Sequence, residues 1–136
     1  MKITKDYIKQ LITEELNKSL NQNRMEEPIS AGVNGKNYRF KLKDWVENAQ
    51  RYPVEDLDPH IFASQLKGVK EDPAERESRI ENADLQYPII IVKHGGGYMI
   101  VDGTHRIRKA IRMGVPVKAH VIPFEDLPSF KKDKSQ

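Results

Sequence analysis

The spacing of apolar side chains divides this chain into segments with different hydrophobic patterns. In residues 1–20 apolar positions recur every three or four residues, which predicts an amphipathic helix from Met1 to Leu20. Residues 17–37 are polar and show little periodicity, which predicts a linker or a loop. From Tyr87 onward, short apolar runs alternate with turn signals, and this is where the pattern predicts the core.

Between the linker and the core, the pattern predicts short elements on a strongly charged stretch of chain. The first of these elements is a helix within 38–52, and the proline at position 53 ends it, because the residue before a proline disfavours helical geometry. In chain order they are a helix within 38–52 with Leu42, Trp45, Val46 and Ala49 on one face, an extended segment over 54–60, a helix over 61–69, and a charged helix or surface loop over 71–84.

The core reads as a hairpin followed by a helix and a further strand. The β-branched run up to Val92 is typical of a strand that is buried on both faces. A glycine-rich turn and a returning strand over 98–101 complete a hairpin, and the helix over 104–113 ends at Gly114. A strand over 115–122 follows, and the order predicts a right-handed βαβ crossover. The expected fold class is therefore α+β, a small mixed sheet with flanking helices plus the N-terminal amphipathic helix.

Composition limits the size of the protein and the chemistry open to it. The chain has 136 residues, of which 38% are hydrophobic and 32% charged, so we expect a small core. We assign residues 1–37 to an N-terminal helix and linker and residues 38–136 to one domain, with its core at about 54–124. The chain has no cysteine, which excludes disulfides, thiolate zinc sites and cysteine nucleophiles. No apolar run is long enough to span a membrane, so we expect a cytoplasmic protein without a membrane partner.

The densest chemistry in the sequence lies where the returning strand meets the helix. Asp102, Gly103, Thr104, His105 and Arg106 follow one another there. The N–H groups and the dipole at a helix start favour an anion, and Gly103 allows a ligand to approach the backbone. Thr104 could cap the helix or bind a phosphate oxygen, Arg106 offers a planar fork for phosphate, and His105 can donate a hydrogen bond or move a proton. Asp102 could cap the helix, hold Mg²⁺ or accept a proton.

Each of these features also has a purely structural interpretation. Asp-Gly is a common turn, threonine is a common helix cap, and Arg106 could simply pair with Asp102. The triple glycine at 95–97 matches neither the P-loop nor the dinucleotide fingerprint, and a flexible hairpin tip explains it better. His94, His105 and His120 all belong to the core region, but their spacing is not that of a recognisable zinc site.

The segment from about Val54 to Phe124 resembles the ParB/sulfiredoxin-like fold. The resemblance rests on the hairpin strand over 98–101, the Asp-Gly-Thr-His-Arg turn over 102–106, and the small residues Ala110 and Gly114. Sulfiredoxins carry a reactive cysteine where this chain has Thr104, so repair of sulfinic acids by that mechanism is excluded. ParB partition proteins bind and hydrolyse CTP through a Gly-Glu-Arg-Arg turn and add a helix-turn-helix domain, for which this chain has no room. The Asp-Gly-x-His-Arg form is most similar to the branch with free-serine kinases and other small ParB-like proteins.

The resemblance implies a site for a nucleotide or another phosphorylated small molecule at Gly103, Thr104, His105 and Arg106. It further implies that any catalysis is magnesium-dependent phosphoryl transfer or nucleotide hydrolysis, with Mg²⁺ and the nucleotide as cofactors. In that chemistry His105 stabilises charge, and Asp102 is the metal ligand or the base. The kinases use an additional acid near the entry segment, for which the candidates here are Glu55, Asp56 and Asp58.

Other functions remain open at this point. Arg108, Lys109 and Arg112 lie on the polar side of the motif helix and could contact DNA or RNA, as a binding module or a ParB-like nuclease would. The formal charge of +3 neither requires nor excludes this partner. A third alternative is a non-catalytic interaction protein or homo-oligomer in which the N-terminal helix makes the contact, because a single short helix must bury its apolar stripe against something.

Overall fold

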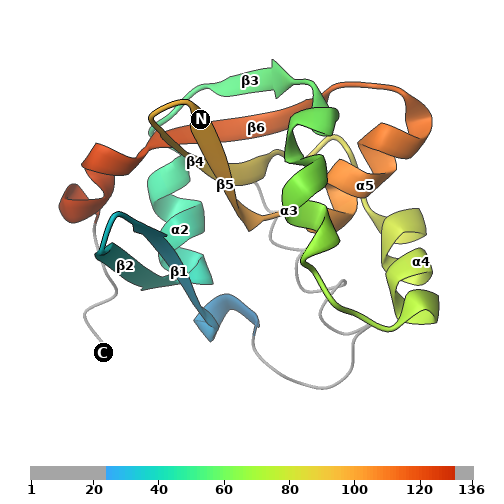
Figure 1. Cartoon of the computed structure of the whole chain (residues 1–136), viewed down its shortest axis with the longest axis horizontal. Coiled ribbons are helices and arrows are strands. Elements are labelled where there is room, and N and C mark those ends of the chain that lie inside the picture. The colour runs from blue at the N-terminus through green and yellow to red at the C-terminus, as the bar shows by residue number, and fades with distance from the viewer. Residues whose placement is uncertain (1–23, 131–136) are drawn as a thin grey trace.

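A four-stranded sheet forms the centre of the computed structural model, which describes residues 24–130 (Figure 1). β4 and β6 run parallel, whereas β3 pairs antiparallel with β6 and β5 pairs antiparallel with β4. The strand order is β3 (Val54–Leu57), β6 (Val117–Pro123), β4 (Ile89–His94), β5 (Gly97–Asp102).

The inner strand β4 is apolar on both of its faces, as its sequence predicts. Successive side chains of a strand point to opposite faces, so Ile90 and Val92 join one apolar cluster while Ile89 and Ile91 join the other. All four side chains are almost completely buried. The sheet is therefore the middle of three layers, and each face needs its own cover.

The first face is covered by a hairpin, a helix and a short C-terminal turn. Its core contains the aromatic rings of Phe40, Trp45 and Phe130, which contact one another with centroids between 5.2 and 5.6 Å apart. The covering elements are η1 (Arg24–Glu26), β1 (Pro28–Val33), β2 (Lys36–Lys41), α2 (Leu42–Ala49) and η3 (Phe124–Ser129). The predicted apolar face of α2 is confirmed, since its four apolar residues are all buried.

The β1–β2 hairpin corrects the interpretation of residues 28–37 as part of a linker, while residues 17–23 of that predicted linker lie outside the described residues. Asn34 and Gly35 form its turn with φ values of 51° and 82°, which is the left-handed conformation that tight hairpins require. Ala31 and Phe40 point into the core from the two strands. The Asn-Gly pair between alternating apolar residues is a strong hairpin signal that a search for long periodic runs overlooks. Residues 28–37 thus belong to the same core as the rest of the structure.

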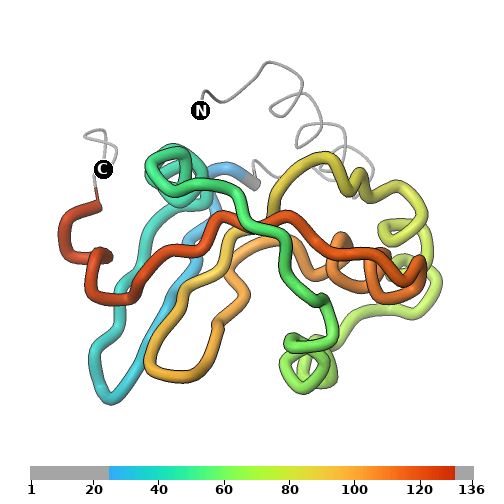
Figure 2. Tube along the Cα trace, turned by 90° about the horizontal axis from the view of Figure 1, so that it is seen from above, coloured from blue at the N-terminus to red at the C-terminus, as the bar shows by residue number. Residues whose placement is uncertain are grey.

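The second face is covered by short helices, some of which precede β4 in the chain while one follows it. Its core is mostly aliphatic, with Phe62, Ile107 and Ala110 packed on Ile89 and Ile91. Figure 2, seen from above, shows the helical cover gathered at one end of the sheet and the β1–β2 hairpin at the other. The covering elements are η2 (Pro59–Phe62), α3 (Ala63–Lys67), α4 (Pro73–Asn82) and α5 (Thr104–Met113).

The connection through α5 differs from the predicted βαβ unit. The β4–β5 hairpin reverses the chain, so β5 and β6 run in opposite directions, and β4 lies between them. The parallel pair is β4 and β6, and the link between these strands contains both β5 and α5. As a result, α5 starts at the end of the sheet where β4 and β6 begin. The rule that ligands bind at the carboxyl ends of parallel strands therefore does not apply to Asp102.

The mixed α+β class, the small sheet and the flanking helices are thus confirmed. The predicted bounds of α5 are confirmed, and Gly114 ends this helix in the left-handed conformation with φ 68°. The charged segment over 71–84 contains the helix α4. The predicted N-terminal helix lies outside the described residues, and so does the oligomer contact expected from it.

Candidate anion-binding site

The first turn of α5 depends on a glycine that no other residue can replace without strain. Gly103 is the N-cap residue, with φ 120°, and a Cβ atom at this position would lie 2.6 Å from Cβ of Ile89 and closer still to its Cγ2. The helix start is therefore pressed against the first residue of β4. Gly103 provides no side-chain cap, and Thr104 is already the first helical residue, which corrects its predicted role as a cap. The phosphate-binding role of Thr104 stays a prediction.

Asp102 and Arg106 form a buried ion pair just below this turn. The Nη1 atom of Arg106 lies 3.7 Å from Oδ2 of Asp102, and the two side chains are 3% and 2% exposed. Burying charged groups is costly unless they are paired, so each residue supports the presence of the other. The structural interpretation of Arg106 is thus the arrangement found, and its guanidinium is not presented to solvent as a phosphate fork.

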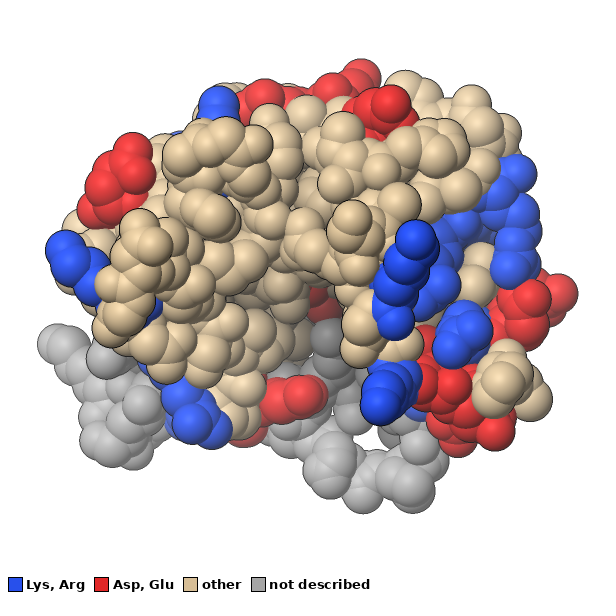
Figure 3. All heavy atoms as spheres, viewed as in Figure 1, with Lys and Arg blue, Asp and Glu red and all other residues tan. Residues whose placement is uncertain are grey.

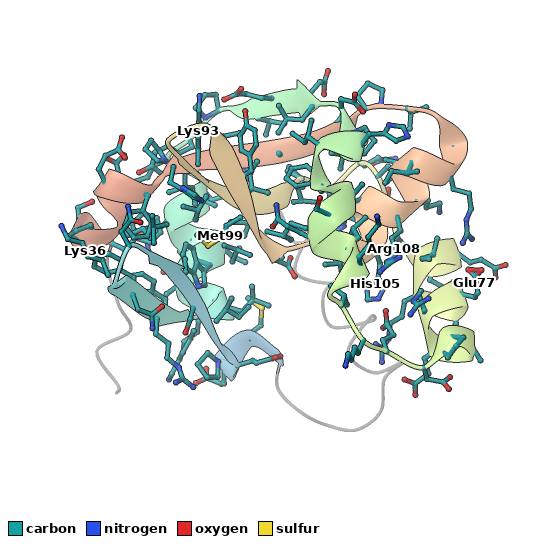
Figure 4. All side chains as sticks on the ribbon, viewed as in Figure 1. Lys36, Glu77, Lys93, Met99, His105 and Arg108 are labelled. Atoms are coloured by element: carbon teal, nitrogen blue, oxygen red, sulfur yellow. The ribbon has the colours of Figure 1, made fainter. Side chains whose placement is uncertain are left out.

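His105 points toward the link between α3 and α4 (Figure 4). Its Nε2 atom lies 3.0 Å from both carboxylate oxygens of Glu71. Because an ionised carboxylate can only accept hydrogen bonds, Nε2 carries the proton when Glu71 is charged. The position and tautomer of the imidazole are therefore fixed by an acid 34 residues earlier in the chain.

Two arginines of α4 join the same carboxylate. Nη1 of Arg79 donates to Oε2 of Glu71 at 2.6 Å, and Nε of Arg76 lies 3.8 Å from Oε1. These two residues are three positions apart, so they share one face of the helix. The side chains of Arg76, Arg79 and His105 are 31%, 27% and 24% exposed, whereas that of Glu71 is 9% exposed. We call these four residues the Glu71 cluster.

The cluster keeps Glu71 ionised. Burial on its own would raise the pKa of Glu71, but the hydrogen bond from His105 and the charges of His105 and Arg79 outweigh it, so the pKa lies below its ordinary value. In Figure 3 charged side chains of both signs crowd over the helical side of the molecule, while the centre of this view is largely uncharged. An anion approaching α5 thus meets guanidinium and imidazole groups that are already gathered.

The entry acids predicted from the sequence lie elsewhere, and Glu71 is the acid that meets the motif. Glu55 and Asp56 lie on β3, the edge strand opposite to β5. Asp58 caps η2, where its Oδ1 accepts hydrogen bonds from the backbone N–H and Nδ1 of His60. The sequence pattern does not single out Glu71 as a site residue, because Glu71 is one of many charged residues in its segment and its pairing with His105 is long-range.

The basic side chains of α5 are engaged within the molecule. Arg108 donates to the carbonyl of Leu66 in α3, and Lys109 donates to the carbonyls of Glu81 and Ala83 at the end of α4. Arg112 pairs with Glu77 of α4 through both carboxylate oxygens. Cations stabilise helix C-termini, where carbonyl groups lack partners. The residues predicted to contact nucleic acid thus hold α3 and α4 onto α5.

The predicted magnesium role of Asp102 does not fit its surroundings. Mg²⁺ favours several oxygen ligands and keeps part of its water shell, whereas Asp102 is a single buried carboxylate beside a guanidinium. Within residues 24–130 no three His, Cys, Asp or Glu side chains gather into a metal-binding group. The core histidines also lie apart, since His94 ends β4 while Nδ1 of His120 donates to the carbonyl of Tyr52.

Comparisons with family models, curated proteins and solved structures found no match for this chain. Over residues 24–130 no helix is both long and apolar enough to span a membrane. A function for this protein is therefore inferred from the geometry of the residues around the start of α5.

Proposed function

We propose that this protein binds a phosphorylated small molecule, and specifically a nucleotide, at the start of α5. One observation carries the proposal: Arg76, Arg79 and His105, from two helices, converge on the carboxylate of Glu71 beside the first turn of α5. Phosphate groups bind well to guanidinium groups and to helix N-termini. The resemblance of residues 98–114 to the ParB/sulfiredoxin-like turn supports the same class of ligand.

The residues of the motif take different parts in this proposal. The backbone at Gly103 and Thr104 provides the approach for the phosphate, and His105 with the two arginines provides the charge. Asp102 and Arg106 support the turn from below through their ion pair. If the ligand reacts, His105 is the group best placed to move a proton, because its imidazole lies among the groups proposed to bind the phosphate. Phosphoryl transfer or nucleotide hydrolysis is then the reaction to test.

Thermal unfolding with ATP, ADP, CTP and GTP, each with and without Mg²⁺, tests this function. We expect at least one nucleotide to raise the melting temperature, because a ligand that binds only the folded state stabilises it. The effect should be lost in Arg79→Gln and kept in Arg112→Gln, which removes the same charge from the far end of α5. A folded wild-type protein that no nucleotide stabilises would overturn the proposal. Incubation with each stabilising nucleotide, followed by analysis for products, then decides whether the site is catalytic.

The DNA- or RNA-binding alternative receives no support from the helix face on which it rested. Arg108 and Lys109 make their hydrogen bonds with carbonyl groups of the protein itself, so phosphate binding would require them to abandon helix ends that they stabilise. The same melting experiment with a DNA duplex added, at low and high salt, distinguishes this alternative, because binding to nucleic-acid phosphates weakens steeply with salt.

A further inference from the structure

Glu71 occupies the point at which the cations of the Glu71 cluster meet. It lies in the link between α3 and α4, one residue before Asp72, which caps α4. The backbone here is anchored, since Oδ2 of Asp72 accepts from the N–H of Glu75 at 3.0 Å and the carbonyl of Glu71 accepts from Nη2 of Arg76 at 3.3 Å. The side chain of Glu71 can therefore change its position while the start of α4 stays in place.

A carboxylate is an incomplete partner for the groups around it. Arg76 and Arg79 bring two positive charges against the single negative charge of Glu71, and Arg79 also pairs with the exposed Glu75, at 3.6 Å. Within residues 24–130, Nε of Arg76 is buried and has no hydrogen-bond acceptor. A buried donor without an acceptor is unfavourable, so this atom favours a ligand with a further oxygen.

A phosphate group matches these donors better than a carboxylate does. A carboxylate has two oxygens in one plane, whereas a phosphate monoester has three terminal oxygens and a charge between −1.5 and −2 near neutral pH. Two arginines and one imidazole that converge from different helices can each take a separate phosphate oxygen. The charge of the phosphate also balances the two guanidinium groups.

We propose that Glu71 is an internal counterion in a phosphate subsite formed by Arg76, Arg79 and His105, and that a ligand phosphate displaces its carboxylate. This inference rests on the proposed function and deepens it, because it names the group that binds the phosphate and the side chain that must move. The exchange forms or breaks no covalent bond. The observed affinity for phosphate then depends on how much more strongly the subsite binds phosphate than it binds the Glu71 carboxylate. Glu71 therefore sets the minimum affinity that a ligand needs in order to displace it.

The exchange predicts that removing the internal competitor tightens phosphate binding. Titration calorimetry with inorganic phosphate compares the wild type with Glu71→Gln, in which the competing charge is lost, and with Glu71→Asp, in which the charge remains on a shorter side chain. We expect Glu71→Gln to bind phosphate about tenfold more tightly, which corresponds to roughly 1.4 kcal/mol. We expect a smaller gain in Glu71→Asp, because its carboxylate still carries the charge but reaches the cations less well. Glu75→Gln is the matched control, because it removes a charge from a neighbour of Arg79 without vacating the subsite, and we expect it to stay within about twofold of the wild type.

The outcomes separate this inference from the proposed function. If a nucleotide stabilises the wild type but neither Glu71 variant binds phosphate more tightly, the nucleotide site stands and the counterion role is wrong. If the Glu71 variants bind phosphate while no nucleotide stabilises the wild type, the subsite stands and the proposed function is wrong. An equal gain in Glu75→Gln would show a general effect of charge and overturn the inference. So would tight phosphate binding that survives Arg79→Gln in the Glu71→Gln background. Circular dichroism confirms that each variant is folded, and Glu71→Asp provides the test if Glu71→Gln is not.

Discussion

The two faces of the central sheet are covered in different ways. On the first face, Phe40, Trp45 and Phe130 pack edge to face or tilted, and apolar burial holds the hairpin and α2 in place. On the second face, α4 contributes to the core little beyond Ile80, and polar contacts from α5 hold it. Apolar packing resists displacement, whereas an ion pair can be exchanged for another ion. We therefore expect a ligand to bind on the charged face.

The strongest test of this difference is to remove the centre of the aromatic face. Trp45 is fully buried, contacts the rings of both Phe40 and Phe130, and donates from Nε1 to the carbonyl of Ile29 at 3.0 Å. We expect Trp45→Ala to lower the free energy of unfolding by about 3–5 kcal/mol, the range for large aromatic truncations. Urea denaturation followed by circular dichroism measures it, with Trp45→Phe as a milder control. A loss below about 1 kcal/mol would contradict the view that packing holds this face.

The next largest effect is expected at the start of α5, where Gly103 packs against Ile89 of β4. Gly103→Ala combines a left-handed φ of 120° with a clash against Ile89, so we expect a loss of about 2–4 kcal/mol. Gly95→Ala is the matched control, since its φ is also positive at 50° but a Cβ atom there meets nothing within 4 Å. We expect it to cost only about 1 kcal/mol. Equal losses from the two variants in urea denaturation would show that backbone strain alone matters at Gly103.

The residues that could be predicted from the sequence are those with local signals. The apolar run of β4, the bounds of α5 and its glycine stop all follow from neighbouring residues. The β1–β2 hairpin also had a local signal in Asn34-Gly35, but its polar surroundings led to the linker interpretation. The direction of β5 relative to β6 could not be predicted, because it depends on which strand inserts between them.

The candidate site could be predicted only in its α5 half. Gly103, His105 and Arg106 stand together in the sequence, whereas Glu71, Arg76 and Arg79 are indistinguishable there from a solvated helix. The burial of Arg106 was also hidden, because an arginine in the first turn of a helix is ordinarily exposed. Long-range pairing of charges leaves no periodic pattern, and this is the physical reason why half of the site was missed.

A smaller effect is a loss of folding stability at low pH, and the pH at which it begins distinguishes His120 in β6 from Glu71 on the second face. Burial lowers the pKa of His120, although its hydrogen bond with the carbonyl of Tyr52 opposes this shift. Protons thus bind more weakly to the folded state, so this stability is present above pH 6.5 and decreases as the pH falls below it. The pKa of Glu71 is also lowered, and its stabilising contribution is lost only as the pH falls below 4.5.

Unfolding free energies measured at several pH values between about 7.5 and 3.5 should therefore fall in two separate stages. We expect His120→Asn, which can still donate to the Tyr52 carbonyl, to remove the upper stage, and Glu71→Gln to reduce the lower one, to which Glu26 and Asp58 also contribute. His94→Asn is the control, because His94 is only partly buried, at the end of β4. An upper stage that survives His120→Asn would show that another group produces it.

The smallest expected effect compares an exposed ion pair between α4 and α5 with a less exposed pair of the Glu71 cluster. Arg112 and Glu77 meet at 2.8 Å, but their side chains are 53% and 56% exposed. Water and salt screen such a pair, so a double-mutant cycle with Arg112→Ala and Glu77→Ala should give a coupling of at most about 0.5 kcal/mol. The corresponding cycle for Glu71 and Arg79, which are 9% and 27% exposed, should give a clearly larger coupling that persists in salt. Equal couplings would mean that the Glu71 cluster is an ordinary surface network. If the coupling between Glu71 and Arg79 is the larger one and falls when phosphate is added, an external anion competes for the same arginine. The exchange at Glu71 requires this competition.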